Sequence, residues 1–304
     1  MSGNMMRLDA NEQAFFKRQT EYIKSKTYDK KYRTLKAKMF IPVSTETPSG
    51  AQFITWRSFS KIGIAKIIAD YANDFPRADV YGEEQTAKVY GIGNSYGYSI
   101  VEIRRAQMAG INLSTKRAEA ARQGHEELHD KLALLGDANY NIPGFINYPG
   151  ITEGTLTTGA GGNTWALKTP DEIIADMTAL KLAVSTPTNG REEINQILLP
   201  RNQYELINQK RMTDTDKTIL AYFRANNPGI EVDILDQLDG AGVGGVDRMM
   251  GYVKNPDNLV QEIPQMFEQF EADKVGMEYV TPCHSEFGSV IVFYPASVAF
   301  IDGI

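Results

Sequence analysis

The strongest periodic pattern in the chain lies between residues 102 and 135. Apolar residues recur there at spacings of three and four, as on one face of a helix; they are Ala118, Ala121, Leu128, Leu132 and Leu135. Ser114 or Thr115 can cap the start of this helix, and Gly136 is suited to end it. The pattern predicts a long helix over about residues 101–136.

Two segments upstream, Phe53–Arg57 and Ala87–Ile92, show the alternation that is typical of strands. Between them, the segment Ile62–Tyr71 has a helical pattern. The whole stretch 51–100 contains few bulky aliphatic residues, so it predicts a two-stranded ribbon that extends away from a core. Because a lone ribbon is only marginally stable in water, we expect it to need a surface to lie on.

Residues 170–238 alternate between helical and strand patterns. Pro170 opens a helix at a position where its missing N–H is tolerated. The pattern then predicts a strand, two helices and a second strand: Ile194–Leu199, Asn202–Gln209, Thr215–Ala225 and Ile230–Leu235. Residues 247–304 are rich in strand patterns, and their most apolar run, Val290–Ile301, predicts one buried strand although it contains Pro295. The sequence therefore predicts a mixed chain with an α/β or α+β fold.

The first fifty residues form a polar, lysine-rich arm. Its apolar residues Ala14, Phe15, Tyr22 and Ile23 give a helical stripe that is too thin to fold alone. The first forty residues carry roughly ten Lys or Arg against about four acidic residues, while the whole chain has a net charge of -6, so the remainder is acidic. We expect the arm to lie against another part of the structure or another subunit, and its charge suits acidic neighbours or DNA.

The composition argues against several classes of protein. The chain has 304 residues and is 42% hydrophobic, which is enough for a sizeable core. The N-terminus has no secretory pattern, and no apolar run is long enough to span a membrane. The single cysteine, Cys283, excludes an internal disulfide and a thiolate-rich metal site, so synthesis in a reducing, intracellular environment is expected. The overall acidic charge argues against sequence-specific binding of nucleic acid.

Residues 125–129 read HEELH and match H-E-x-x-H, the helical motif of zinc hydrolases. In such a site His125 and His129 bind zinc, and Glu126 activates a water molecule. A third ligand is expected a turn or a helix further on. Here a glycine-rich loop follows Leu135, and the only other histidine is His284.

The helical pattern also argues against a zinc site. His125 falls within the apolar stripe, and Glu127 and Asp130 place charges where zinc-binding helices usually bury uncharged residues. We therefore predict that the motif is a packed helix face, and that His125, Glu126 and His129 form no metal site. A zinc hydrolase that uses these three residues is the alternative from another functional class.

Two other features of the sequence give equally weak evidence for a binding or catalytic site. Residues 240–245 match G-x-G-x-x-G, but a dinucleotide site needs a helix directly after the motif. The residues from Arg248 onward have a strand pattern instead, so the motif predicts a flexible hairpin loop. Cys283 and His284 are neighbours on a strand and point to opposite faces, so they are poorly placed as a nucleophile and its base. The sequence predicts no catalytic residue, no cofactor and no enzymatic activity.

Three stretches nevertheless carry a family resemblance through their order along the chain. They are Thr86–Gly97 leading into Tyr98–Ala106, then Ser114–Gly136 followed by Gly144–Asn147, and the ending Val280–Ile304. In this order the chain resembles the major capsid proteins of tailed bacteriophages, whose Hong Kong 97-type shell fold is shared by encapsulins.

The resemblance implies an organisation into four parts. These are an N-terminal arm (1–50), an extended loop (51–100), a peripheral domain with the spine helix (101–168 and 247–304) and an α/β axial domain (169–246). Some relatives lose a leading segment by cleavage; because this chain starts at Met1, we expect no such cleavage. Some also cross-link their subunits through a Lys–Asn bond, but no spacing among Lys88, Asn255 and Asn258 identifies a reactive pair.

The resemblance also implies a function. The chain is expected to assemble into the pentamers and hexamers of an icosahedral head that encloses a double-stranded DNA phage genome, together with portal, scaffold and decoration proteins. It would be located in the virion after assembly in the host cytoplasm, with no membrane contact. An encapsulin-like compartment is the alternative within the same fold. The expected contacts between subunits involve Tyr81, Lys88, Tyr90, Arg104 and Arg105.

Overall fold

The computed structural model describes residues 34–63, 65, 77–109, 115–213 and 215–304. Most of the expected N-terminal arm and most of the helical pattern predicted at Ile62–Tyr71 lie outside these residues. The elements described below all belong to one compact unit, Leu35–Ile304.

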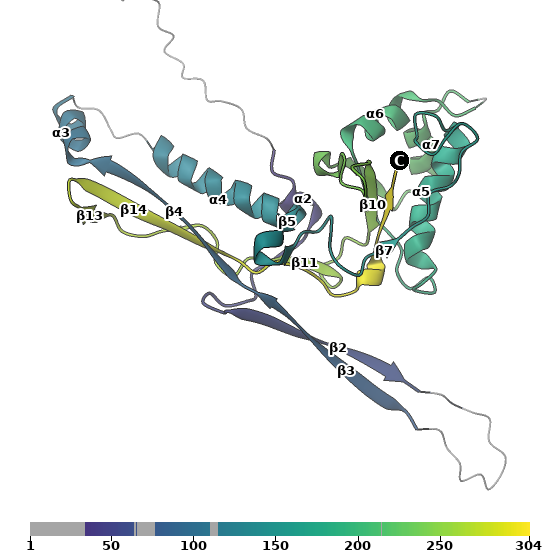
Figure 1. Ribbon diagram of the computed structural model, residues 1–304, viewed down its shortest axis with the longest axis horizontal. Helices are drawn as coiled ribbons and strands as arrows, with labels where there is room; N and C mark the ends of the chain where they lie inside the picture. Colours follow the sequence, from purple (N-terminus) through teal and green to yellow (C-terminus); the bar gives the residue numbers. More distant parts are fainter. Residues whose placement is uncertain (1–33, 64, 66–76, 110–114, 214) are drawn as a thin grey trace, which may run out of the picture. The chain divides into compact units, whose positions relative to one another are not determined.

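A five-stranded mixed sheet forms the first core. Its strands, in spatial order, are β7 (Thr152–Glu153), β16 (Val298–Asp302), β10 (Arg248–Tyr252), β8 (Gln196–Leu199) and β9 (Glu231–Ile234). Three helices pack around it: α5 (Pro170–Ser185), α6 (Arg201–Gln209) and α7 (Ile219–Asn226). Helix α5 lies against β10 and β16, and α6 lies against β9 (Figure 1). The strand pairing therefore joins segments from both sides of the expected domain boundary at residue 246.

A second set of strands surrounds the other core. Strands β1 (Val43–Ser44), β11 (Leu259–Glu262) and β15 (Val290–Val292) form a three-stranded sheet. Strand β14 (Glu278–Phe287) pairs with β12 (Glu268–Gln269), β13 (Asp273–Val275) and β4 (Tyr90–Ser99). Strands β4 and β14 are antiparallel over ten residues, from Ser99 opposite Glu278 to Tyr90 opposite Phe287. Helix α4 (Lys116–Leu134) lies on this pair, with the short helix α2 (Ala37–Phe40) beside it.

Short elements complete the unit. They are a hairpin of β5 (Gly136–Asp137) and β6 (Ile142–Pro143), and the 3₁₀ turns η1 (Ala138–Tyr140), η2 (Asp236–Leu238) and η3 (Pro295–Ser297).

The predicted long helix is present as two helices, α3 (Ile100–Ala109) and α4. Thr115 occupies the N-cap position of α4, but its side chain makes no capping hydrogen bond. The residues between these two helices, 110–114, lie outside those that the structure describes. The predicted end is confirmed, since Gly136 follows α4 with φ +71°.

The predicted ribbon is confirmed, but its second strand is displaced. Strand β2 (Phe53–Ile62) pairs with β3 (Asp79–Lys88) over ten residues, and these two strands form a sheet of their own. The segment Tyr90–Ile92, predicted as part of the ribbon, instead begins β4 and pairs with β14. The polar residues of β3 gave no apolar alternation, so the pattern could not reveal that strand.

Helix α5 begins as predicted at Pro170, where Thr169 and Glu172 form a reciprocal capping box. The predicted strands and helices between residues 194 and 235 correspond to β8, α6, α7 and β9. The G-x-G-x-x-G loop is indeed followed by a strand, β10, but it closes no hairpin, because β8 lies between β9 and β10.

The run Val290–Ile301 does not form the single strand predicted for it. It contains β15 and most of β16, which belong to different sheets and are separated by the η3 turn at Pro295. Proline has no N–H for a strand ladder and fixes φ, so the chain changes sheet at this residue.

Gly136 provides a test of how α4 ends. A β-carbon at this residue would overlap the carbonyl oxygen of Ile142, in addition to the strain of φ +71°. We expect Gly136→Ala to lower the free energy of unfolding by at least about 3 kcal/mol. Gly190→Ala is the matched control: its φ is +74° with no atom near the added carbon, so it should cost only about 1 kcal/mol. Urea unfolding of both variants measures the difference, and equal losses would contradict this account.

Candidate functional site

Helix α4 directs His125 and His129, one helical turn apart, toward β4 and β14. Both residues are buried, with exposed fractions of 2% and 6%. His125 Nδ1 lies 2.7 Å from Ser285 Oγ, and His129 Nε2 lies 3.0 Å from the same oxygen. His125 Nε2 lies 3.0 Å from Asn94 Oδ1. A single serine on β14 therefore joins both histidines to the sheet, and Asn94 connects His125 to β4.

The hydrogen-bond partners determine which nitrogen carries the proton in each ring. Asn94 Nδ2 donates to the carbonyl oxygen of Ala121 at 2.9 Å, so Asn94 Oδ1 faces His125 and accepts from its Nε2–H. In a neutral His125 ring, Nδ1 then accepts from the Ser285 hydroxyl. The Ser285 oxygen in turn accepts from His129 Nε2–H. This arrangement is complete only when both rings are neutral.

The surroundings also favour neutral rings. Burial lowers the pKa of His129 to about 4, with the positive charge of Lys38 as a second cause and Glu126 opposing. Burial likewise lowers the pKa of His125, and His284 adds to this effect. His129 Nδ1 is buried without a hydrogen-bond partner among the described residues.

Two acidic residues of α4 connect this helix to the chain around α2. Glu126 Oε2 lies 2.5 Å from Lys38 Nζ. Asp130 Oδ1 accepts hydrogen bonds from the backbone N–H groups of Lys36 and Ala37, each at 2.7 Å. Glu126 is therefore paired with a cation.

This geometry does not favour the zinc alternative. Both ring nitrogens of His125 and one of His129 are engaged by neutral partners. Within the residues that the structure describes, no cluster of three or more His, Cys, Asp or Glu side chains is suited to hold a metal ion.

The ribbon has one partly covered face and one open face. Residues Ile54 and Trp56 alternate as half-buried with the exposed Phe53, Thr55 and Arg57. The covered side contacts the body of the same chain, where the Trp56 ring meets Phe293 edge-on at 6.0 Å between centroids.

The open face of the ribbon carries apolar side chains in solvent. Phe59 and Val80 are 64% and 61% exposed, and they lie on this face with the salt-bridged pair Arg57–Glu84. Large exposed apolar side chains on a two-stranded sheet are typical of a surface that packs against another surface.

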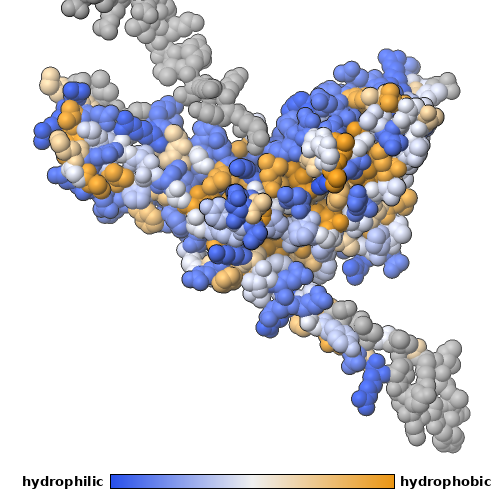
Figure 2. Space-filling model, in the orientation of Figure 1, coloured by the Kyte–Doolittle hydropathy of each residue, from blue (hydrophilic) through white to orange (hydrophobic). Residues whose placement is uncertain are grey.

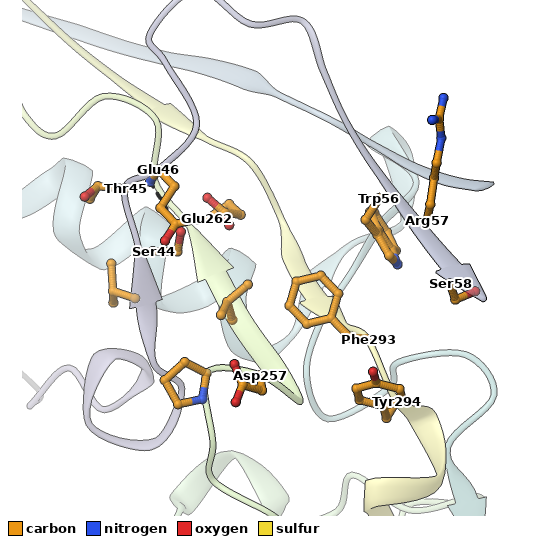
Figure 3. A pocket seen from close by; sticks show the side chains of 13 residues that line it. Ser44, Thr45, Glu46, Trp56, Arg57, Ser58, Asp257, Glu262, Phe293 and Tyr294 are labelled. Carbon is orange, nitrogen blue, oxygen red and sulfur yellow. Dashed lines mark hydrogen bonds between the residues drawn. The ribbon is translucent and has the colours of Figure 1, made fainter. Parts of the chain in front are cut away.

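A groove of about 630 Å³ lies at the root of the ribbon (Figure 3). Trp56 and Phe293 face into it, whereas Arg57 points away (Figure 3). Three acidic residues, Glu46, Asp257 and Glu262, also line it. The groove thus combines aromatic and acidic side chains.

The predicted contact residues lie in three places. Tyr81 is exposed on the ribbon. Lys88 and Tyr90 line a second groove of about 410 Å³ at the ribbon root, where Lys88 Nζ lies 5.2 Å from the centre of the Tyr90 ring. The Tyr90 hydroxyl donates to the backbone oxygen of Tyr140.

Arg104 and Arg105 are exposed on α3. Apolar side chains gather at the same end of the molecule, over α3 and the turn between β13 and β14 (Figure 2). They include Met108, Val275 and Met277. This combination of cationic and apolar groups again suits a surface for another protein.

Comparison with known proteins assigns the family. The model of the family described as "Major capsid protein" matches residues 63–304, which is most of the chain. The chain belongs to the major capsid protein family.

The fold of this capsid protein is also similar to solved capsid structures. The capsid of Myoviridae phage XM1 gives a TM-score of 0.79 at 18% identity, covering 94% of this chain and 98% of that one. The capsid of a native GTA particle gives 0.66 at 11% identity, covering 97% and 99%. A virus-like particle from Pyrococcus furiosus gives 0.52 at 13% identity, covering 86% and 90%. No curated protein matches the chain.

Sequence reasoning missed the partners of the histidines in this capsid protein. Ser285 and Asn94 lie far from α4 in the sequence and carry no motif of their own. One weak signal existed: Ser285 lies on the same side of β14 as the buried Cys283, opposite to His284. A serine on a buried strand face needs a hydrogen-bond partner.

The shared serine gives a test of this network. Ser285→Ala removes the hydroxyl that accepts from His129 and donates to His125, leaving two buried nitrogen atoms without partners. We expect a loss of about 2–3 kcal/mol in the free energy of unfolding. Ser95→Ala, at an exposed residue on the adjacent strand β4, is the control and should change stability by less than about 0.5 kcal/mol. Chemical denaturation measures both; similar values for the two variants would show that the network contributes little.

Proposed function

We propose that many copies of this capsid protein assemble into a closed icosahedral shell of pentamers and hexamers that encloses the double-stranded DNA of a tailed phage. The observation that carries this proposal is the β2–β3 ribbon, whose open face exposes Phe59 and Val80. Such a face gains stability when it lies on a second copy of the chain. Burying one large apolar side chain contributes about 1.5–3 kcal/mol, and a shell repeats the contact in every subunit.

The contact between ribbon and neighbour joins two different surfaces. A contact of this kind repeats from copy to copy until the curvature of the assembly closes it into a ring or a shell. The ribbon is therefore suited to building a closed container from one chain. Pentamers are supported by the GTA particle, whose capsid was computed with C5 symmetry.

The contact residues remain part of the proposal. Tyr81 would contact the neighbour through the ribbon, and Lys88 and Tyr90 through the groove at its root. Arg104 and Arg105 would bind acidic groups of another copy, next to the exposed Met108.

The net charge and the family of the chain support a proposal for the contents of the shell and for its partner proteins. A net charge of -6 suits a wall that encloses DNA without reading its sequence. A container of this kind needs no catalytic group. Portal, scaffold and decoration proteins are proposed partners in the virion, after assembly in the host cytoplasm. Helices long and apolar enough to cross a membrane are not found in the described residues.

The proposal is tested by particle formation and by a ribbon variant. The purified chain, with its scaffold where one is required, should form particles visible by electron microscopy and of megadalton mass by light scattering. Phe59→Ser combined with Val80→Ser should lower particle yield at least about tenfold, since each interface loses more than about 1.4 kcal/mol. The circular dichroism spectrum of the subunit should be unchanged.

The control replaces an apolar side chain elsewhere. Val243, 82% exposed on the glycine-rich loop before β10, should tolerate Val243→Ser with full particle yield. A chain that stays monomeric at high concentration with all its phage partners would refute the shell. Particles that protect an enzyme instead of DNA from digestion would favour an encapsulin-like compartment.

A further inference from the structure

Hydrogen bonds join the buried histidines His125 and His129 of α4 to the β4–β14 sheet. An additional proton on either ring would disrupt this hydrogen-bond network. A proton on His125 Nδ1 would make both rings donate to Ser285 Oγ, leaving the serine hydroxyl to find a new acceptor. A proton on His129 Nδ1 would create a buried N–H at an atom that has no hydrogen-bond partner among the described residues. Either event also places a positive charge between α4 and β14 in a buried interface, which is costly without a paired anion.

The groups around the pair do not supply that anion. Glu126 on α4 is paired with Lys38 of α2, and Asp130 accepts from two backbone N–H groups. On β14, His284 adds positive charge when protonated, and Glu268 of β12 lies opposite it in the strand register. The remaining contacts are uncharged. They are Asn94 on β4, the ring of Phe267 at 5.0 Å from His125, and the ring of Phe287 at 5.6 Å from His129.

Protons can nevertheless reach the rings. A cavity of about 20 Å³ is lined by both histidines together with Lys38 and Glu126. That volume is about enough for one water molecule. The side chains of Lys38 and Glu126 are partly exposed, so the cavity lies close to solvent.

We propose that His125, His129, Ser285 and Asn94 form an acid-sensitive latch, which fastens helix α4 to the β4–β14 sheet at neutral pH and releases it when a ring takes up a proton. The latch lies within one subunit, and its opening does not depend on the proposed function. Only its consequence rests on that function: acid would loosen the subunits of an assembled shell.

The direction of the pH effect follows from the pKa values. Both histidines have a pKa below the ordinary 6.5 when α4 is docked, and that of His129 falls to about 4. The released helix binds a proton more readily than the docked one. The latch is therefore fully closed above about pH 6.5 and weakens as the pH falls from 6.5 toward 4, by about tenfold per pH unit for His129.

The test is backbone hydrogen exchange of residues 116–134, read by mass spectrometry at pH 7.5, 5.5 and 4.5 and corrected for the intrinsic effect of pH. The wild-type chain should lose protection in α4 by about 100-fold between pH 7.5 and 4.5. His129→Gln keeps an N–H donor near Ser285 and leaves only His125 to take up a proton, so it should lose clearly less protection than the wild type over this range. His284→Gln, which replaces the half-buried third histidine, is the matched control and should open like the wild type.

A second measurement keeps the test independent of whether the variant folds. Exchange of the imidazole C2 hydrogen in the wild-type chain reports the protonation midpoint of each histidine. The latch requires a midpoint for His129 well below pH 6.5, with α4 opening over the same range. It is overturned if α4 stays protected at pH 4.5, or if His129→Gln opens at the same pH as the wild type. Because α4 can be followed in particles and in free subunits, a chain that forms no particles would refute the shell and leave the latch to be judged on its own result.

Discussion

The open face of the β2–β3 ribbon is the surface on which the proposed shell depends, because the described residues of its own chain cover only the opposite face in part. Its two strands pair with each other over ten residues, yet only Ile54, Trp56 and Ser58 on β2 and Ala87 on β3 are partly covered among the ribbon side chains that are described. Two strands alone are marginally stable in water. The apolar side chains of Phe59 and Val80 are exposed on the open face. On the proposed function, a second copy of the chain covers this face in the shell, and assembly then stabilises part of the subunit.

The rest of the subunit supplies a rigid base for this ribbon. Strand β3 is followed directly by β4, which pairs with β14 along its whole length and is connected to α4 through Asn94 and His125. Movement of α4 on the sheet would therefore be transmitted to the strand from which the ribbon emerges. The HEELH sequence acquires a physical role in this way: its histidines hold a helix on a sheet, and its Glu126 is paired with Lys38 of α2.

Much of the fold could be predicted from the sequence, because its core elements have clear periods. The proline at the start of α5, the glycine stop after α4 and the alternation at Phe53–Arg57 are local signals, and each gave the correct type of element. The failures have physical causes. Strand β3 is polar because both of its faces are largely exposed, so it has no apolar alternation, and Pro295 divides an apolar run whose two halves then join different sheets. The histidine site could not be predicted, because it depends on a hydrogen bond between His125 and Ser285. These residues are 160 positions apart in the sequence, and no local pattern encodes such a contact.

The most direct measurement of the central claim is backbone hydrogen exchange of the ribbon in assembled particles and in dissociated subunits under the same conditions. The account predicts that the paired amides of β2 and β3 exchange at least about 100-fold faster in free subunits than in particles, while those of β8 and β10 are protected in both. Equal and strong protection of the ribbon in free subunits would show that the chain stabilises it alone, and would contradict the account.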